Sequence, residues 1–301
     1  MCQDHNMIQA YIDGKDMYSW IASFIYNVPY EQCKEFNPDG SKNPEGKERR
    51  TSVKGLILGL MYGRGIASIA EQLHTSKEKA QEINDKFFNS FPKVQQYIHD
   101  TQNHAREYGF VETAWGRKRR LPDIQLPKYE FNFSKKASME YDPLDFEQTP
   151  KDYWDDNLVK KYTKLMDNAY GRLQKEQVKA KAREEGIEIK DNGGYIADAE
   201  RQCVNSVIQG PAADMTKKAM ILIGNDKQLK EWGCKLVLQV HDEVIAECPL
   251  KYAKQCGERL SKLMIESAKE KISVPMKCDA EATKQWYGEV LNLEEIEERC
   301  L

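Results

Sequence analysis

The chain has 301 residues, of which 40% are apolar and 31% charged, with a formal net charge of −3. This length can bury a large core, and this composition is typical of a folded protein and not of a disordered one. The apolar runs are far too short to span a bilayer and no signal-peptide pattern opens the sequence, so we expect a soluble cytoplasmic protein without a membrane partner.

Local charge is more informative than net charge. Residues 117–120 are four consecutive cations, and residues 160–183 hold eight basic residues against two acidic ones. An acidic protein can still bind phosphates along such a track. For 160–183 taken alone, however, a solvated helix face is the favoured interpretation. The eight cysteines include no CxxC pair, which favours free buried thiols over disulfides or a metal site.

The first part of the chain is expected to be helical. Apolar spacing predicts helices within residues 1–35, a loop at 37–47 and a helix over 49–62 that two glycines end. Beyond them, Thr75 or Ser76 is expected to cap a further helix.

A second helix after Pro92 is expected to run to Tyr108, with Gly109 ending it. Residues 110–115 then have the pattern of a short strand that leads into the basic run. Residues 125–197 differ in character, and we interpret them as an insertion or subdomain. In this stretch we expect a poorly periodic segment, a lysine-rich helix over 158–185 and a hairpin turning at Asn192-Gly193.

The last part of the chain mixes helices and strands. A helix over 198–220 is expected to break at Gly210-Pro211. Two β-rich runs, 234–240 and 243–248, then form a tight hairpin. A helix over 252–271 and a closing strand over 274–282 follow. This order of elements predicts an α+β fold, with a mostly helical first part and part of an antiparallel sheet with packed helices.

The first candidate site is a line of side chains at Arg50, Lys54, Leu58 and Tyr62. Residues four apart share one face of a helix, and the line would be about 18 Å long at about 1.5 Å per residue. Because free N–H groups and the helix dipole favour anions at a helix N-terminus, this face suits a triphosphate with a base beyond it. An amphipathic helix with two ordinary surface cations has the same spacing.

The second candidate site is the hairpin turn at His241-Asp242-Glu243. Its adjacent carboxylates repel each other and favour a counter-cation such as Mg²⁺. An exposed turn that uses Asp for local hydrogen bonds is the alternative. A third, weaker pattern is Arg201, Asn205 and Gln209, a polar strip able to hydrogen-bond a duplex edge or simply to face water.

Five motifs follow one another along the chain: RRTSVKGLILGLMYG, FFNSFPKVQQYI, GFVETAWGRKRRLPD, AERQCVNSVIQGPAADM and LVLQVHDEV. In this order they resemble the motifs of family A DNA polymerases. The resemblance extends from Asp4 to about Gly288, apart from 125–197. It implies a right-hand polymerase fold, whose thumb lies outside this chain. The implied divisions are a palm-to-fingers connection at 1–16, fingers at 17–124, the insertion at 125–197 and the C-terminal palm at 198–301.

The resemblance also implies a role for each candidate residue. Arg50 and Lys54 match the residues that bind the phosphates of the incoming deoxynucleoside triphosphate, and such groups offset charge during phosphoryl transfer. Asp242 matches the carboxylate that binds both Mg²⁺ ions of a two-metal mechanism, with Glu243 in a supporting role. At the nucleotide base the matching residues are Leu58, Tyr62 and Gly63. The implied contacts to template-primer DNA are Arg201, Asn205, Gln209, Gln239, His241, Arg117, Lys118, Arg119 and Arg120.

Two departures from the family pattern matter. Leu58 stands where the family usually has an aromatic residue, which together with the insertion resembles phage-encoded members. The family's other metal-binding aspartate stands in a DYSQIE-like strand for which this sequence has no match. We therefore expect an incomplete metal site, little activity of this chain alone, and a need for an upstream polymerase segment. A nucleic-acid and nucleotide-binding relic without catalysis is the main alternative, and an unrelated Mg²⁺ phosphohydrolase built on residues 241–243 is a weaker one.

Overall fold

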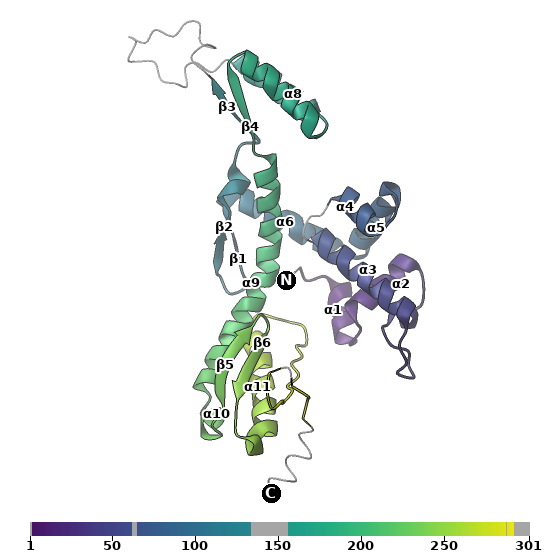
Figure 1. Ribbon diagram of the computed structural model, residues 1–301, viewed down its shortest axis with the longest axis vertical. Coiled ribbons are helices and arrows are strands. Elements are labelled where there is room, and N and C mark those ends of the chain that lie inside the picture. Colours follow the sequence, from purple (N-terminus) through teal and green to yellow (C-terminus); the bar gives the residue numbers. More distant parts are fainter. Residues whose placement is uncertain (1, 62–64, 134–155, 287, 292–301) are drawn as a thin grey trace, which may run out of the picture. The chain divides into compact units, whose positions relative to one another are not determined.

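The computed structural model describes residues 2–61, 65–133, 156–286 and 288–291 (Figure 1). The chain divides into two compact units, one made of residues 1–120 and 201–301 and the other of residues 121–200. Within the described ranges, no helix is long and apolar enough to cross a membrane. The seven cysteines of these ranges are free thiols, and burial raises the pKa of Cys33, Cys234 and Cys256.

The larger unit begins with six helices. They are α1 (His5–Ile12), α2 (Met17–Tyr26), α3 (Pro44–Met61), α4 (Ile66–Gln72), α5 (Lys77–Ser90) and α6 (Pro92–Tyr108). A short 3-10 helix, Tyr30–Cys33, follows α2. Aspartates start the first two helices, because Asp4 and Asp16 accept hydrogen bonds from backbone N–H groups of the first turns. The buried core of this part contains Ile21 from α2, Leu56 from α3 and Phe87 from α5.

The helices of this region follow the expectations except at one boundary. Ser76 caps α5, accepting a hydrogen bond from the Lys79 N–H at 3.2 Å, as one of the two expected caps. Gly109, with φ +74°, ends α6 as expected. The expected start of α3 at 49 is wrong, because α3 begins at Pro44. Proline suits the first position of a helix, where its missing N–H removes no hydrogen bond.

A hairpin and the part of a long helix from residue 201 onward lie side by side in the larger unit. The hairpin consists of β1 (Phe110–Glu112) and β2 (Lys118–Arg120), so the basic run itself forms a strand. The helix is α9 (Gly193–Asn225), which continues through Pro211. The expected break at Gly210-Pro211 is therefore wrong: a proline removes one hydrogen bond, and the packed helix continues past it. Gly210 lets the two elements approach closely, since a Cβ there would lie 2.6 Å from the Thr113 methyl carbon.

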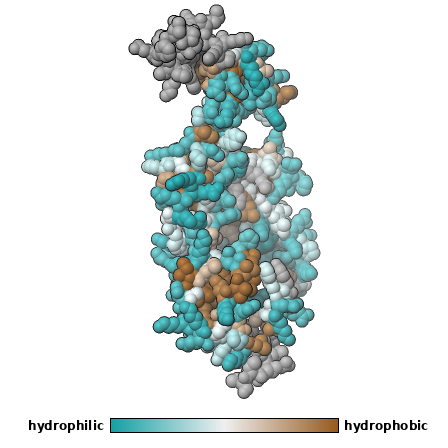
Figure 2. Space-filling view, turned by 60° about the vertical axis from the view of Figure 1, so that its left-hand side comes forward, coloured by the Kyte–Doolittle hydropathy of each residue, from teal (hydrophilic) through white to brown (hydrophobic). Residues whose placement is uncertain are grey.

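The C-terminal part holds the expected hairpin and helix. After α10 (Lys227–Glu231), β5 (Lys235–Val240) pairs with β6 (Glu243–Glu247) in antiparallel register, and α11 (Ala253–Ala268) follows a 3-10 turn, Leu250–Tyr252. Leu229, Cys256 and Leu263 form the buried core beneath the hairpin. Val237 and Leu238 of β5 are 56% and 40% exposed. Figure 2 shows apolar surface gathered into a patch on the face drawn there.

The expected closing strand over 274–282 is wrong. Residues 274–282 form no strand or bridge in the structure, and an isolated bridge between Thr283 and Val290 follows them. Alternating apolar residues favour a strand only where a neighbouring strand supplies hydrogen bonds. In the described part of the chain no strand lies beside 274–282 to supply them.

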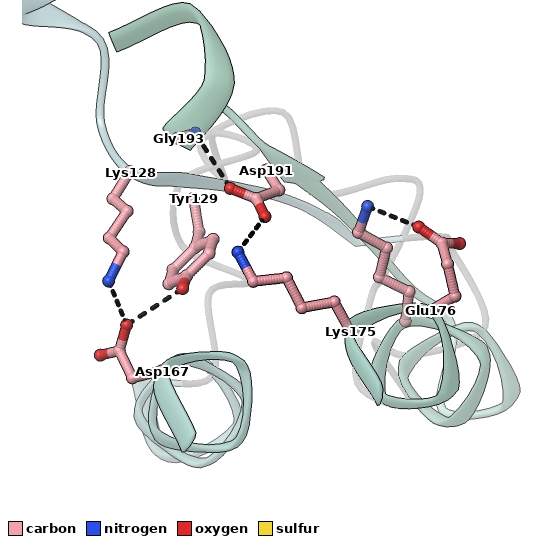
Figure 3. Close-up of polar contacts among 8 residues, drawn as sticks. Lys128, Tyr129, Asp167, Lys175, Glu176, Asp191 and Gly193 are labelled. Carbon is pink, nitrogen blue, oxygen red and sulfur yellow. Dashed lines mark hydrogen bonds and ion pairs between the residues drawn. The ribbon is translucent and has the colours of Figure 1, made fainter. Parts of the chain in front are cut away.

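The smaller unit is a two-stranded sheet with two helices. Its strands are β3 (Tyr129–Phe133) and β4 (Ile187–Asp191), and its helices are α7 (Asp156–Asn168) and α8 (Gly171–Glu184), preceded by a 3-10 turn, Pro122–Gln125. The ion pairs Lys128–Asp167 at 2.5 Å and Lys175–Asp191 at 2.7 Å tie the sheet to the helices (Figure 3).

Two expectations for this unit are wrong. The single helix over 158–185 is two helices, because the chain turns at Tyr170 and Gly171, where φ is +77°. The expected hairpin at Asn192-Gly193 is absent as well. The strand β4 pairs with β3, which lies much earlier in the sequence, and α9 begins at Gly193. Buried Asn192 donates to the Pro127 carbonyl at 2.9 Å and to Glu130 at 2.6 Å, so a tertiary role overrides its turn propensity.

The described residues are therefore mostly helical, with three two-stranded antiparallel sheets. This agrees in class with the expected α+β fold. The expected division into fingers and palm, and the expected larger sheet around β5 and β6, remain predictions.

Candidate nucleotide and nucleic-acid site

Arg50 of α3 and Asp16 at the start of α2 form a two-point ion pair. Arg50 donates from Nε to Asp16 Oδ2 at 2.9 Å and from Nη2 to Asp16 Oδ1 at 3.0 Å. Asp16 also accepts from the Ser19 N–H at 2.8 Å. Burial of the Asp16 carboxyl opposes its ionisation, but the hydrogen bonds from Arg50 and Ser19 outweigh burial and lower the pKa of Asp16. Arg50 is thus held in place while it stays partly exposed.

Lys54 lies on the same side of α3 as Arg50. The aromatic ring of Tyr18 links them, since Arg50 Cζ lies 5.6 Å and Lys54 Nζ 5.9 Å from the ring centroid. The core side of α3 is buried, with Val53 and Leu56 each 1% exposed. The helix therefore turns its two cations away from the core, and the structure brings together the two residues expected to bind a triphosphate.

The sequence predicted that the N-terminus of α3 would help this cluster to attract an anion, and this prediction is wrong. Because α3 begins at Pro44, Arg50 is in the second turn, beyond the free N–H groups and most of the dipole effect. Any attraction for an anion here comes from the side-chain charges of Arg50 and Lys54. Leu58 follows on α3 and is half-buried, whereas Tyr62 and Gly63 lie outside the described residues.

The turn between β5 and β6 presents three exposed polar side chains: His241, Asp242 and Glu243. His241 adopts φ +54°, a left-handed conformation that tightens the turn, and the Gln239 side chain donates to the His241 carbonyl. Within the described ranges no three His, Cys, Asp or Glu residues gather closely enough to hold a metal ion. Carboxylate oxygens are nevertheless hard ligands, and Mg²⁺ in proteins commonly takes only one or two of them, with waters and phosphates completing its shell. Asp242 and Glu243 fit such a partial donor set.

The polar strip is present on one helix. Arg201, Asn205 and Gln209 follow at four-residue intervals on α9. Arg201 and Gln209 are exposed. The Asn205 side-chain oxygen is buried and accepts no hydrogen bond from the described part of the chain.

The basic run makes specific contacts within the larger unit. Arg117 donates to Asp214 Oδ1 at 2.7 Å and to the Gly210 carbonyl at 3.1 Å, and Arg119 donates to the Gln202 side chain at 3.2 Å. These two arginines therefore join the β1–β2 hairpin to α9. Lys118 pairs with Glu112 at 3.2 Å and Arg120 is exposed. Their contacts to DNA remain predictions.

Sequence reasoning missed Asp16 and Tyr18. Asp16 carries a capping signal, an aspartate just before an apolar helical run. That signal predicts the start of α2 and does not indicate a partner 34 residues away. Tyr18 carries no distinguishing signal, because its place beside Arg50 and Lys54 arises from the packing of α2 against α3.

The known proteins that this chain resembles belong to one family. The sequence profile of DNA polymerase family A matches residues 1–141 and 155–288. The thermostable DNA polymerase I of Thermus aquaticus is 25% identical over 285 residues, and the DNA polymerase I of Geobacillus stearothermophilus is 27% identical over 289 residues. Each match covers 95% of this chain, which spans about a quarter of the length of these curated relatives.

The fold has a counterpart among solved structures. The POL domain of Pol1 from M. smegmatis, in complex with DNA primer-template and dNTP, superposes with a TM-score of 0.56 at 24% identity. That match covers 92% of this chain and 35% of the other. The profile match extends over nearly the whole sequence and includes α3, α9 and the β5–β6 hairpin, so this chain belongs to DNA polymerase family A.

Proposed function

We propose that this chain supplies the fingers and the C-terminal palm of a DNA-directed DNA polymerase. In that reaction a primer 3′-hydroxyl attacks a deoxynucleoside triphosphate chosen by the template, and pyrophosphate leaves. The observation that carries the proposal is the convergence of Arg50 and Lys54 on Tyr18, on the exposed side of α3, in a chain of this family.

The chain's own residues bind and orient the reactants. Arg50 and Lys54 hold the triphosphate and offset the charge that grows on it during transfer. Leu58, with Tyr62 and Gly63 beyond it, lines the base of the incoming nucleotide. Along the duplex, contacts to the minor groove and primer end come from Arg201, Asn205, Gln209, Gln239 and His241. Acceptors in that groove are shared by A·T and T·A pairs, so such contacts test geometry more than sequence.

Asp242 and Glu243 are the residues of this chain that would hold Mg²⁺. When bound, the metal ions supply Lewis-acid stabilisation of the reacting oxygens. Because these two carboxylates form only part of a two-metal donor set, we propose that a further polymerase segment carries the family's other metal-binding aspartate.

Two features of the palm support a further segment. Val237 and Leu238 on β5 are exposed apolar side chains on a two-stranded sheet, and sheets of this size are marginal unless more strands or helices cover them. Residues 274–282 have strand alternation without a strand beside them in the described ranges. A segment that adds a strand here would account for both.

A binding relic without catalysis is the second candidate function. The incomplete carboxylate set favours it, since nucleotide and DNA contacts do not need Asp242. Primer extension with Mg²⁺ and four deoxynucleotides separates the two candidates, using the chain alone and the chain with a separately expressed family A segment that bears a DYSQIE-like strand. Extension only in the mixture, abolished by Asp242→Ala, is the expected result. DNA binding without extension in either case would favour the relic.

A further inference from the structure

Three aromatic side chains meet on the surface where α6 ends and β1 begins. The ring centroids of His104 and Tyr108 are 4.7 Å apart, those of His104 and Phe110 are 5.5 Å apart, and those of Tyr108 and Phe110 are 6.3 Å apart. The helix places His104 and Tyr108 on one side, four residues apart, and Gly109 turns the chain so that Phe110 joins them.

These rings remain open to solvent. Tyr108 is 55% exposed, His104 is exposed and Phe110 is half-buried. Contiguous exposed aromatic surface is unusual on a folded protein and commonly marks a binding site. Tyrosine and histidine rings present flat faces on which another planar group can stack.

Cations border the aromatic group. Phe110 lies opposite Arg120 in the β1–β2 register, and Lys118 Nζ lies 4.3 Å from the centroid of the Phe110 ring. Glu112, paired with Lys118, and Glu107, beside Tyr108, are the acidic groups nearby. Of the basic run 117–120, Lys118 and Arg120 lie on the same face of the hairpin as Phe110, whereas Arg117 and Arg119 contact α9.

We propose that His104, Tyr108 and Phe110, with Lys118 and Arg120, form a stacking platform for single-stranded DNA. Rings that stack on successive bases next to cations that follow the backbone are the physical elements of sequence-tolerant single-strand binding. Arg117 and Arg119 hold the hairpin that carries Phe110, Lys118 and Arg120 against α9, the helix that bears the polar strip. The biological occupant, an unpaired template strand, rests on the proposed function, whereas the binding itself does not require catalysis.

The test is the affinity of the full chain for a labelled oligodeoxythymidine of about ten nucleotides, which is within the usual site sizes. Tyr108→Ala should weaken binding by at least about fivefold, the equivalent of one lost base stack. Tyr108→Phe keeps the ring and should bind within about twofold of the unmodified chain. Tyr11→Ala removes another exposed tyrosine, 53% exposed on α1, and should leave affinity unchanged.

Two further measurements locate the strand. Arg120→Ala should lower the slope of log affinity against log salt by about 0.7, the value for one phosphate contact on a single strand. Photo-crosslinking of a 5-iododeoxyuridine oligonucleotide should label a peptide that contains residues 104–110. An absence of oligonucleotide binding at low salt, unchanged affinity in Tyr108→Ala, or crosslinks confined to other peptides would overturn the proposal.

Failure of the platform and failure of the polymerase proposal give different results. A chain without extension activity whose Tyr108→Ala variant loses single-strand affinity supports the platform and counts only against catalysis. An active, complemented chain whose Tyr108→Ala variant binds the oligonucleotide normally overturns the platform alone.

Discussion

Arg50 donates two hydrogen bonds to the Asp16 carboxylate. Arg50 is also one of the two cations expected to bind a nucleoside triphosphate. Asp16 at the same time caps α2. One carboxylate therefore fixes both the start of α2 and the position of the guanidinium on α3. A bound triphosphate would have to share Arg50 with Asp16 or displace it.

Substitutions at Asp16 should separate its two roles. Asp16→Ala removes the cap and the partly exposed ion pair and should lower the free energy of unfolding by about 1–2 kcal/mol. Asp16→Asn keeps a good capping side chain and should lower it by about 0–1 kcal/mol. Urea unfolding of the two variants measures the difference, and equal losses would show that the cap contributes nothing.

Arg117 should matter for stability whether or not it touches DNA. Arg117→Ala leaves the Asp214 carboxylate, 11% exposed, without its cation and should lower the free energy of unfolding by about 1–3 kcal/mol. Arg120→Ala is the matched control, since no ion pair within the described part of the chain holds Arg120, and its effect should stay within about 0.5 kcal/mol. Urea unfolding of the two variants measures both free energies. Equal stability of the two variants would contradict the structural role of Arg117.

The pairing of Asp226 with Arg259 should make the C-terminal part of the chain sensitive to acid. Hydrogen bonds from Arg259 lower the pKa of Asp226, with burial opposing them and the Leu229 N–H adding to them. A lowered folded-state pKa gives stability that is fully present above the unfolded value of about 3.9 and is lost as pH falls through the folded value. The urea concentration at the unfolding midpoint should therefore decrease as the pH is lowered below about 4.

Two variants test that assignment. Asp226→Asn and Arg259→Gln should each flatten the acid decline of the urea midpoint, because each removes one partner of the same ion pair. If the urea midpoints of both variants decline with acid in the same way as that of the unmodified chain, other carboxylates cause the acid sensitivity.

Leu58 is the position at which an aromatic ring should change catalysis. Leu58→Phe in the complemented enzyme adds a ring that stacks on the incoming nucleotide and should raise the incorporation rate or the use of dideoxynucleotides by about 2- to 12-fold, the equivalent of about 0.5–1.5 kcal/mol. Single-turnover incorporation measures both quantities. Leu58→Met keeps a flexible apolar side chain and is the control, and a Leu58→Phe variant that matches it in both assays would contradict the role of residue 58.

Local signals predicted much of the fold. Ser76, Gly109 and the alternation of residues 234–248 set element boundaries through capping, left-handed conformation and strand periodicity, and each acts over a few residues. The errors arose where contacts between residues far apart in the sequence determine the local structure. Asn192 has a strong turn propensity but is buried against Pro127 and Glu130, and Pro211 is carried inside a packed helix.

The candidate site divides in the same way. Helical spacing sufficed to place Arg50 and Lys54 on one face of α3, and the hairpin pattern placed Asp242 and Glu243 at a turn. The partners of these cations could not be predicted, because Asp16 and Tyr18 reach α3 only through the packing of α2. Likewise, nothing in the basic run distinguishes Arg117, which Asp214 holds, from Arg120, which faces solvent.

The most direct test of the central claim is single-nucleotide incorporation opposite each of the four template bases, with Mg²⁺ and the chain complemented by a segment bearing the DYSQIE-like strand. We expect each template base to direct incorporation of its complement, and Asp242→Ala to reduce the rate by at least about a hundredfold, as for loss of a group that stabilises transition-state charge. Incorporation that ignores the template base, or that survives Asp242→Ala unchanged, would contradict the account.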